Sequence, residues 1–212
     1  MVIDHVGLFF FPEEIVYRLI GRISFPLFAF LIANGAHFTK DIKKYIRRMF
    51  IFALISQFPY YLAHGLVDAN NNHLNVLFTF TIALFAILLI RMANNKIISI
   101  IVAVGASAFA YLLNMDYGAF GVLLTISFYL FFENFPVSAL FFVLLALATS
   151  FMRGVRGVYV NLSQISFGPP VSTLSLAFIY LYNRKEGPKA KYLFYIFYPL
   201  QYFVFYLAKT LL

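Results

Sequence analysis

Apolar segments follow one another along almost the whole chain, separated by short polar stretches. Of the 212 residues, 63% are hydrophobic and 11% are charged, whereas about a quarter of the residues of a soluble domain are charged. A helix needs about 20 apolar residues to cross a bilayer. The sequence therefore predicts an all-α polytopic integral membrane protein, a single domain over residues 1–212, with about nine transmembrane helices (roughly eight to ten), several of them short or broken.

The individual spans can be placed from their polar boundaries. An interfacial helix is expected over Ile15–Arg22, with Arg18 and Arg22 one turn apart. The first apolar stretch, Met1–Phe11, is about half a membrane span, so we expect this helix to be truncated and to continue upstream. The other expected spans are Ile23–His37, Ile46–Leu62, Leu74–Ile90, Ile97–Leu113, Ala119–Phe132, Val137–Phe151, Val171–Tyr182 and Tyr192–Lys209.

Lysine and arginine are unevenly shared between alternate loops. One side carries Lys40, Lys43, Lys44, Arg47, Arg48, Arg91, Lys96, Arg184, Lys185, Lys189 and Lys191, and the other carries Arg18, Arg22, Arg153, Arg156 and Lys209. Because cytoplasmic loops are the richer in these residues, we expect a plasma-membrane protein with its N-terminus inside and its C-terminus outside. The longest loop, Arg153–Pro170, would then lie outside. The same rule accounts for the net charge of +8, so no nucleic-acid partner is expected.

Two ionisable residues, Asp4 and His5, interrupt the first apolar stretch. Such groups at membrane depth are costly and usually functional. Histidine exchanges a proton near neutral pH, so His5 is the expected general base, while Asp4 is expected to pair with Arg18 or Arg22. The alternatives are an ion pair that only fixes the first helices together, or a transport pathway, and the residues alone leave all of these open.

Other polar residues are predicted at membrane depth, where they would line a cavity or form interhelical hydrogen bonds. The candidates for the cavity, or for stabilising an oxyanion, are Arg22, Asn34, Gln57, Asn75, Asp116 and Tyr117. A basic cluster would bind the phosphates of an anionic cofactor, or would only obey the positive-inside rule: Lys40, Lys43, Lys44, Arg47 and Arg48. No metal site is expected, because the chain has no cysteine and its four histidines are distributed over different parts of the chain and both faces of the membrane.

Segments along nearly the whole chain resemble the TraX family of membrane proteins. They are Asp4-His5-x-Gly7, Arg18-x-x-Gly21-Arg22-Ile23-Ser24-Phe25-Pro26-Leu27-Phe28-Ala29-Phe30-Leu31, Tyr45-x-x-Arg48, Ser56-Gln57-x-Pro59, Leu74-Asn75-Val76-Leu77-Phe78-Thr79, Asp116-Tyr117-Gly118-x-x-Gly121-Val122-Leu123 and Phe194-Tyr195-x-Phe197-Tyr198-Pro199-Leu200. The chain departs from the family pattern at Gln201, where a histidine is expected, and at Asn34, where an acidic residue is expected.

The resemblance implies an enzyme that moves an acetyl group from cytoplasmic acetyl-coenzyme A to an amine or hydroxyl reached from the outer face. TraX itself is associated with acetylation of the N-terminus of conjugative pilin. In the wider group of similar membrane acyltransferases, a histidine or polar residue of the first span serves the chemistry, and His5 is its counterpart here. A protein N-terminus, a glycan and a lipid all fit as acceptor. A proton-coupled or lipid-related transporter and a non-catalytic membrane protein are the alternatives, and monomer and oligomer are both open.

Overall fold

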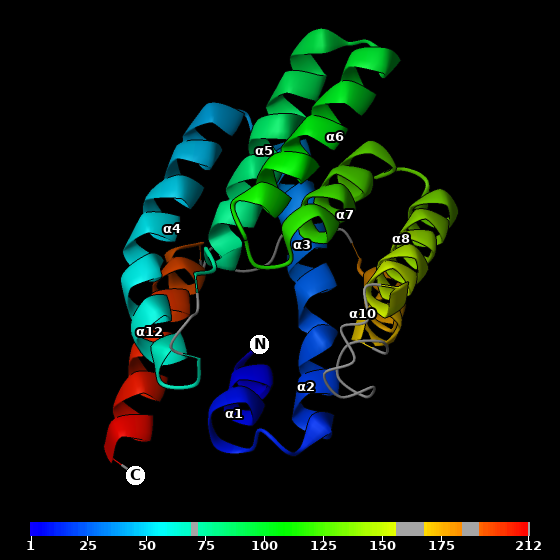
Figure 1. The fold of residues 1–212 in the computed structure, drawn as a ribbon. Coiled ribbons are helices and arrows are strands. Elements are labelled where there is room, and N and C mark those ends of the chain that lie inside the picture. Colours follow the sequence, from blue (N-terminus) through cyan, green and yellow to red (C-terminus); the bar gives the residue numbers. More distant parts are fainter. Residues whose placement is uncertain (69–71, 156–167, 184–190, 212) are drawn as a thin grey trace.

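The computed structural model describes residues 1–68, 72–155, 168–183 and 191–211, and the statements of structure below refer to these residues. They form helices and no β-sheet, apart from one isolated bridge between Leu74 and Met115. The helices are α1 (Val2–Phe10), α2 (Ile15–Arg22), α3 (Ser24–Phe38), α4 (Ile42–Gly65), α5 (Val76–Ala93), α6 (Lys96–Leu112), α7 (Gly118–Leu130), α8 (Phe135–Val155), α10 (Gly168–Ser172), α11 (Ser175–Tyr180) and α12 (Lys191–Leu211) (Figure 1).

Three stretches of helix are long and apolar enough to cross a membrane, and they are Ile15–Phe38, Val76–Ala93 and Phe135–Met152. Lys96–Leu112, Gly118–Leu130 and Pro170–Tyr180 are shorter apolar helices. Helices satisfy their own backbone polar groups, which is what a chain in lipid requires. The all-helical prediction is confirmed and the membrane assignment is supported, while the number of spans stays a prediction. Most of the predicted loop Arg153–Pro170 lies outside the described residues, as do Arg184, Lys185 and Lys189.

The predicted interfacial helix is part of a longer one. Ile15–Phe38 is a continuous stretch of 24 residues in which α2 passes into α3 (Figure 1). The residue between them, Ile23, keeps helical dihedral angles (φ −67°, ψ −29°), and its N–H bonds to the Ile20 carbonyl. Pro26 lies in the first turn of α3. A proline there is compatible with helical dihedral angles, although it has no N–H to donate. The two predicted segments therefore share one direction.

Two glycines allow the short α1 to lie directly against α2. A Cβ at Gly7 would collide with Tyr17, and a Cβ at Gly21 would collide with Asp4. Glycine is needed wherever two backbones approach this closely. The absence of side chains at Gly7 and Gly21 therefore lets α1 pack closely against α2, with Asp4 directly against Gly21.

The turn between α6 and α7 is held against the residue before α5. The Leu74 N–H bonds to the Asn114 carbonyl at 3.1 Å, and the Asp116 N–H bonds to the Leu74 carbonyl at 2.8 Å. Tyr117 then takes a left-handed conformation with φ 60°, and Gly118 starts α7 with φ 41°. Left-handed angles reverse the chain sharply, so this turn presents Asp116 and Tyr117 to the centre of the molecule.

One end of the molecule gathers basic residues, because α3 and α5 finish there and α4 and α6 begin there. Arg91 of α5 joins these elements through hydrogen bonds to the carbonyls of Ala36, at 2.7 Å, and His37, at 3.3 Å. We call this the basic end, defined by Lys40, Lys43, Lys44, Arg47, Arg48, Arg91 and Lys96. The α1–α2 turn and the C-terminus lie toward the opposite end (Figure 1).

Candidate functional site

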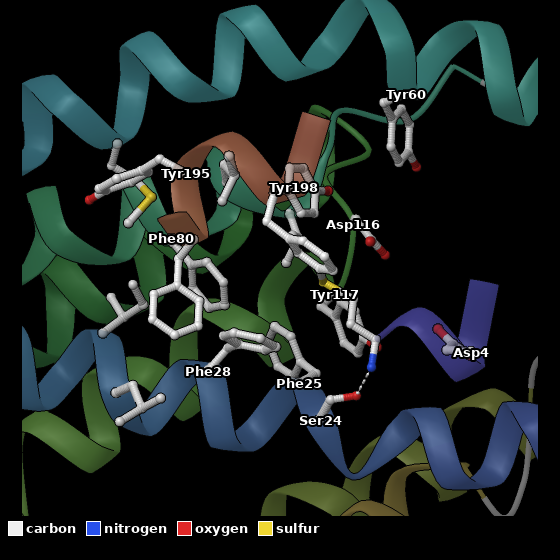
Figure 2. Close-up of a pocket in the computed structure, with 18 of the residues that line it drawn as sticks. Asp4, Ser24, Phe25, Phe28, Tyr60, Phe80, Asp116, Tyr117, Tyr195 and Tyr198 are labelled. Atoms are coloured by element: carbon white, nitrogen blue, oxygen red, sulfur yellow. Dashed lines mark hydrogen bonds between the residues drawn. The ribbon is translucent and has the colours of Figure 1, made fainter. Parts of the chain in front are cut away.

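A cavity of about 580 Å³ lies in the centre of the helices. Its lining comes from α1, α2, α3, α4, α5, α12 and the α6–α7 turn. Figure 2 shows Asp4, Asp116 and Tyr60 toward one side and Tyr195 at the other, with Phe25, Phe28 and Phe80 along the wall between them. The cavity therefore has polar groups toward its two ends and an aromatic middle.

The cavity is long. Tyr45 and His64 of α4 both line it, as do Ser24 and Thr39 at the two ends of α3. With a rise of 1.5 Å per residue, Tyr45 and His64 are separated by about 28 Å of helix, which is close to the roughly 30 Å thickness of a hydrocarbon core. One cavity therefore connects the basic end with the region around His5, which we call the His5 end.

His5 occupies an aromatic environment at this end and is only 7% exposed. Its Nε2 lies 3.0 Å from the Tyr202 hydroxyl, and the two ring centroids are 4.7 Å apart. Its Nδ1 is buried and has no hydrogen-bond partner among the described residues. When Nε2 carries the proton and donates to the tyrosine oxygen, Nδ1 is left with a lone pair. A histidine in this state can accept a proton.

Asp4 and His5 both line the cavity, but they have different partners. The Asp4 carboxylate is 2.8 Å from Nη1 of Arg18, and the same guanidinium nitrogen donates to the Asp4 carbonyl at 3.2 Å. Of the two predicted partners, Arg18 therefore forms the ion pair. This pair joins α2 to α1 directly beside the general-base candidate.

Arg22, Asp116 and Tyr117 also line the His5 end. The Arg22 guanidinium carbon is 5.8 Å from the centre of the Tyr117 ring, and that ring stacks on Phe25 with centroids 3.6 Å apart. Burial raises the pKa of the Asp116 carboxyl in the α6–α7 turn, and the Arg22 guanidinium acts in the opposite direction. A cation, a carboxyl group and a phenol thus meet on the Asp4 side of the cavity.

Sequence reasoning missed several residues of this end. Tyr60 and His64 of α4 and Tyr198 and Tyr202 of α12 all line the cavity. The Nδ1 of His64 lies 3.1 Å from the Tyr60 carbonyl oxygen, which can only accept, so this nitrogen carries the proton. For the residues of α12, the available sequence signal was the Tyr198-Pro199 segment within the family resemblance. His64 had no such signal, because it lies between the predicted spans Ile46–Leu62 and Leu74–Ile90.

At the basic end the structure separates the predicted phosphate-binding residues. Lys40, Lys43, Lys44 and Arg47 are exposed and do not belong to the cavity lining, whereas Arg48 does. The Arg48 guanidinium carbon is 5.8 Å from the centre of the Tyr45 ring. Arg48 is therefore the member of the basic cluster that faces the interior.

Three of the predicted cavity residues do not line the cavity, and they are Asn34, Gln57 and Asn75. Asn75 precedes α5 and is fully buried: its Nδ2 donates to the Ala53 carbonyl and to Gln57 Oε1, both at 2.8 Å, and its Oδ1 accepts from the Leu77 N–H. Gln57 Nε2 in turn donates to the His73 carbonyl at 3.0 Å. These two amides clamp α4 to the start of α5, so their hydrogen-bonding groups are in use.

Neither departure from the family pattern lies on the cavity. The Asn34 Nδ2 is 3.3 Å from the Tyr182 hydroxyl, on the outer side of α3 toward α11. Gln201 on α12 is 6% exposed and outside the lining, and its amide has no partner among the described residues. The two departures therefore leave the lining groups of the cavity unchanged. No cluster of three or more histidine, aspartate or glutamate residues suited to a metal ion occurs in the described part of the chain.

Comparison with known proteins gives a family and two relatives. A family model described as TraX protein matches residues 1–209. The chain is 27% identical over 216 residues to the "Probable fimbrial assembly protein FimC, serogroup H1" of Dichelobacter nodosus, with 94% of this chain and 87% of that protein covered. A stretch of 57 residues is 40% identical to the "Uncharacterized protein RP591" of Rickettsia prowazekii (strain Madrid E), with 27% of this chain and 21% of that protein covered. No solved structure matches the chain.

Proposed function

This chain belongs to the TraX protein family, and we propose that it is a membrane-embedded acetyltransferase. It takes the acetyl group of acetyl-coenzyme A at the basic end, which faces the cytoplasm, and transfers it to an amine or hydroxyl that enters from the outer face. The observation that carries the proposal is the single long cavity, with Arg48 toward one end and His5 toward the other. A reaction between a cytoplasmic donor and an outer acceptor needs such a connection.

The length of the donor supports this arrangement. Arg48 and Tyr60 are 12 residues apart on α4, which corresponds to about 18 Å of helix rise, and Tyr60 lies beside His64 and Tyr202 at the His5 end. The chain from phosphate to sulfur in coenzyme A has about as many bonds as four extended residues, or about 15 Å. The two lengths agree to within the reach of one side chain. A phosphate near Arg48 would thus present the thioester near His5.

The chemistry at the His5 end is an acyl transfer. The acceptor nitrogen or oxygen attacks the thioester carbonyl carbon, and its proton passes to Nδ1 of His5. The carbon–sulfur bond then breaks, and the proton on His5 goes to the departing thiolate. Tyr202 holds His5 in the required tautomer through Nε2, and the Arg22 guanidinium is the donor that we assign to the oxyanion, in place of Asn34 and Asn75.

The fimbrial relative supports a particular acceptor. The chain matches over 94% of its length a protein described as a probable fimbrial assembly protein. We therefore infer that the acceptor is the N-terminal amine of a subunit of a surface fibre. An N-terminal amine is nucleophilic only when neutral, so a histidine that removes the proton during attack fits this acceptor.

Transfer of labelled acetyl groups in proteoliposomes tests the proposal. Purified protein receives labelled acetyl-coenzyme A on one side and a fibre-subunit N-terminal peptide on the other. We expect acetyl-peptide to form with the wild type, and His5→Ala to lower the rate by about 100-fold or more. His37→Ala is the matched control, because His37 is exposed and outside the cavity lining. Equal rates in the His5→Ala variant would reject the assignment of His5, and solute flux without consumption of acetyl-coenzyme A would identify a transporter instead.

A further inference from the structure

One arginine that lines the cavity has a buried N–H without a hydrogen-bond partner among the described residues. Arg48 lines the cavity from the first turns of α4, and its Nε is buried without a hydrogen-bond partner. An unpaired buried N–H of a charged group costs more than a neutral one, so a site of this kind favours an acceptor of opposite charge. We propose that Arg48 is the anion-binding residue of the cavity and takes a phosphate group, an inference that rests on the proposed function for the identity of the phosphate.

Two other arginines have guanidinium groups that make structural hydrogen bonds or ion pairs. Arg91, also at the basic end, donates to the Tyr129 hydroxyl at 2.6 Å and to carbonyls at the end of α3. Arg18 pairs with the Asp4 carboxylate. Both are used by the fold, whereas Arg48 contacts a tyrosine ring and presents an unpaired N–H. A structural link between helices therefore does not account for the buried, unpaired N–H of Arg48.

The surroundings of Arg48 favour an anion. Asp41, the acidic residue nearest to it in sequence, is exposed and accepts a hydrogen bond from the Lys44 N–H as the cap of α4. The ion pair found in the described residues is at the other end of the cavity. The exposed Lys43 and Lys44 add positive charge at this end of the molecule. An anion would thus be drawn to this end and would meet its charge partner at Arg48.

The planar guanidinium indicates a phosphate ester rather than a simple halide ion. Two parallel N–H groups match two oxygens of a phosphate, and this bidentate pairing is stronger than a contact to a point charge. The phosphate can come from coenzyme A or from the headgroup of an anionic lipid. Both have the same chemistry at this site, so binding measurements must separate them.

Binding to the full-length protein in phosphatidylcholine nanodiscs, measured by calorimetry, tests the proposal. The probes are coenzyme A, 4′-phosphopantetheine and pantetheine, of which the last has no phosphate. We expect Arg48→Gln to weaken the binding of the two phosphorylated probes by about 10- to 100-fold and to leave pantetheine unchanged. Arg48→Lys keeps the positive charge but lacks the planar guanidinium, so the binding of the two phosphorylated probes should weaken less than in Arg48→Gln. Arg47→Gln, one position away on the exposed surface, is the matched control and should change binding less than about threefold.

A second arm adds phosphatidic acid to the nanodiscs and follows its retention by the purified protein. Loss of phosphatidic acid in Arg48→Gln, with coenzyme A binding unchanged, would keep the phosphate site but assign it to a lipid headgroup. Unchanged binding in both arms, or an equal loss in Arg47→Gln, would overturn the proposal. Because binding needs no catalysis, a protein that binds phosphate through Arg48 but transfers no acetyl group would retain this site and lose the proposed function. Thermal unfolding of each variant shows that the fold is intact.

Discussion

The hydroxyl of Tyr202 lies 3.0 Å from Nε2 of His5, although 197 positions separate the two residues. Tyr202 belongs to α12, the last helix, and His5 to α1, the first. The hydrogen bond therefore joins α1 to α12 beside the cavity and engages Nε2 of His5, which leaves Nδ1 as the ring nitrogen without a partner among the described residues.

Replacing Tyr202 with phenylalanine tests this relationship. The variant keeps the ring but removes the hydroxyl, so Nε2 no longer has its partner and both tautomers of His5 become accessible. We expect acetyl transfer to fall by about tenfold and its dependence on pH to change, with little change in thermal stability. Tyr206→Phe on the same helix is the control, because Tyr206 does not line the cavity. Equal kinetics and pH profiles for the two variants would contradict the positioning role.

The Asp4–Arg18 ion pair should contribute to stability. The side chains are 12% and 22% exposed, so removing one partner leaves the other charge in a poorly solvated place. Asp4→Asn is expected to destabilise the protein by about 1–3 kcal/mol. Thermal unfolding in detergent, with Arg18→Gln and the double variant completing the cycle, measures the coupling. Glu13→Gln on the exposed α1–α2 turn is the control, and additive effects of the single changes would argue against the pair.

Two Gly→Ala substitutions should have opposite effects. A Cβ at Gly21 would lie 2.5 Å from Cγ of Asp4, so α1 must move away from α2 and Asp4 with it, and we expect a loss of about 1–3 kcal/mol together with lower activity. A Cβ at Gly105 meets nothing within 4 Å, and alanine in the interior of α6 should stabilise by about 0.5–1 kcal/mol. Melting temperatures of the two variants give the comparison. A stabilised Gly21→Ala variant would mean that α1 is not packed as described.

The Asn75 clamp should matter for folding rather than for chemistry. Asn75→Ala removes the side-chain donor of the Ala53 carbonyl, leaves Gln57 Oε1 with only the backbone N–H of residue 75, and removes the cap of α5. We expect a loss of about 2–3 kcal/mol, with transfer by the remaining folded protein close to normal. Asn72→Ala, in an exposed position, should be nearly neutral. A stable but inactive Asn75→Ala variant would show that Asn75 takes part in the reaction, and it would contradict a purely structural role.

Much of the helical arrangement could be predicted from the sequence, because apolar length and polar boundaries are local properties. The predicted span Leu74–Ile90 differs from α5 at its start, since Asn75 caps the helix through the Leu77 N–H instead of continuing it. Ile15–Arg22 was separated from the next span by its arginines, yet both belong to one continuous helix. Charge indicated a water interface at a point where the arginines in fact face a cavity.

The sequence by itself determined that this chain is an all-helical protein of apolar segments, that its basic residues gather at one end, and that Asp4 and His5 are exceptional. Tertiary structure decided which polar residues share a cavity. Asn75 and Gln57 were as plausible as Arg22 and Asp116 in the sequence, but they bond to each other, because the partner of a polar side chain is set by which helices meet. Spacing along one helix predicts which residues share its face, whereas contacts between α1, α4 and α12 arise only on packing. For that reason Tyr202 and His64 became visible beside His5 only in the folded protein.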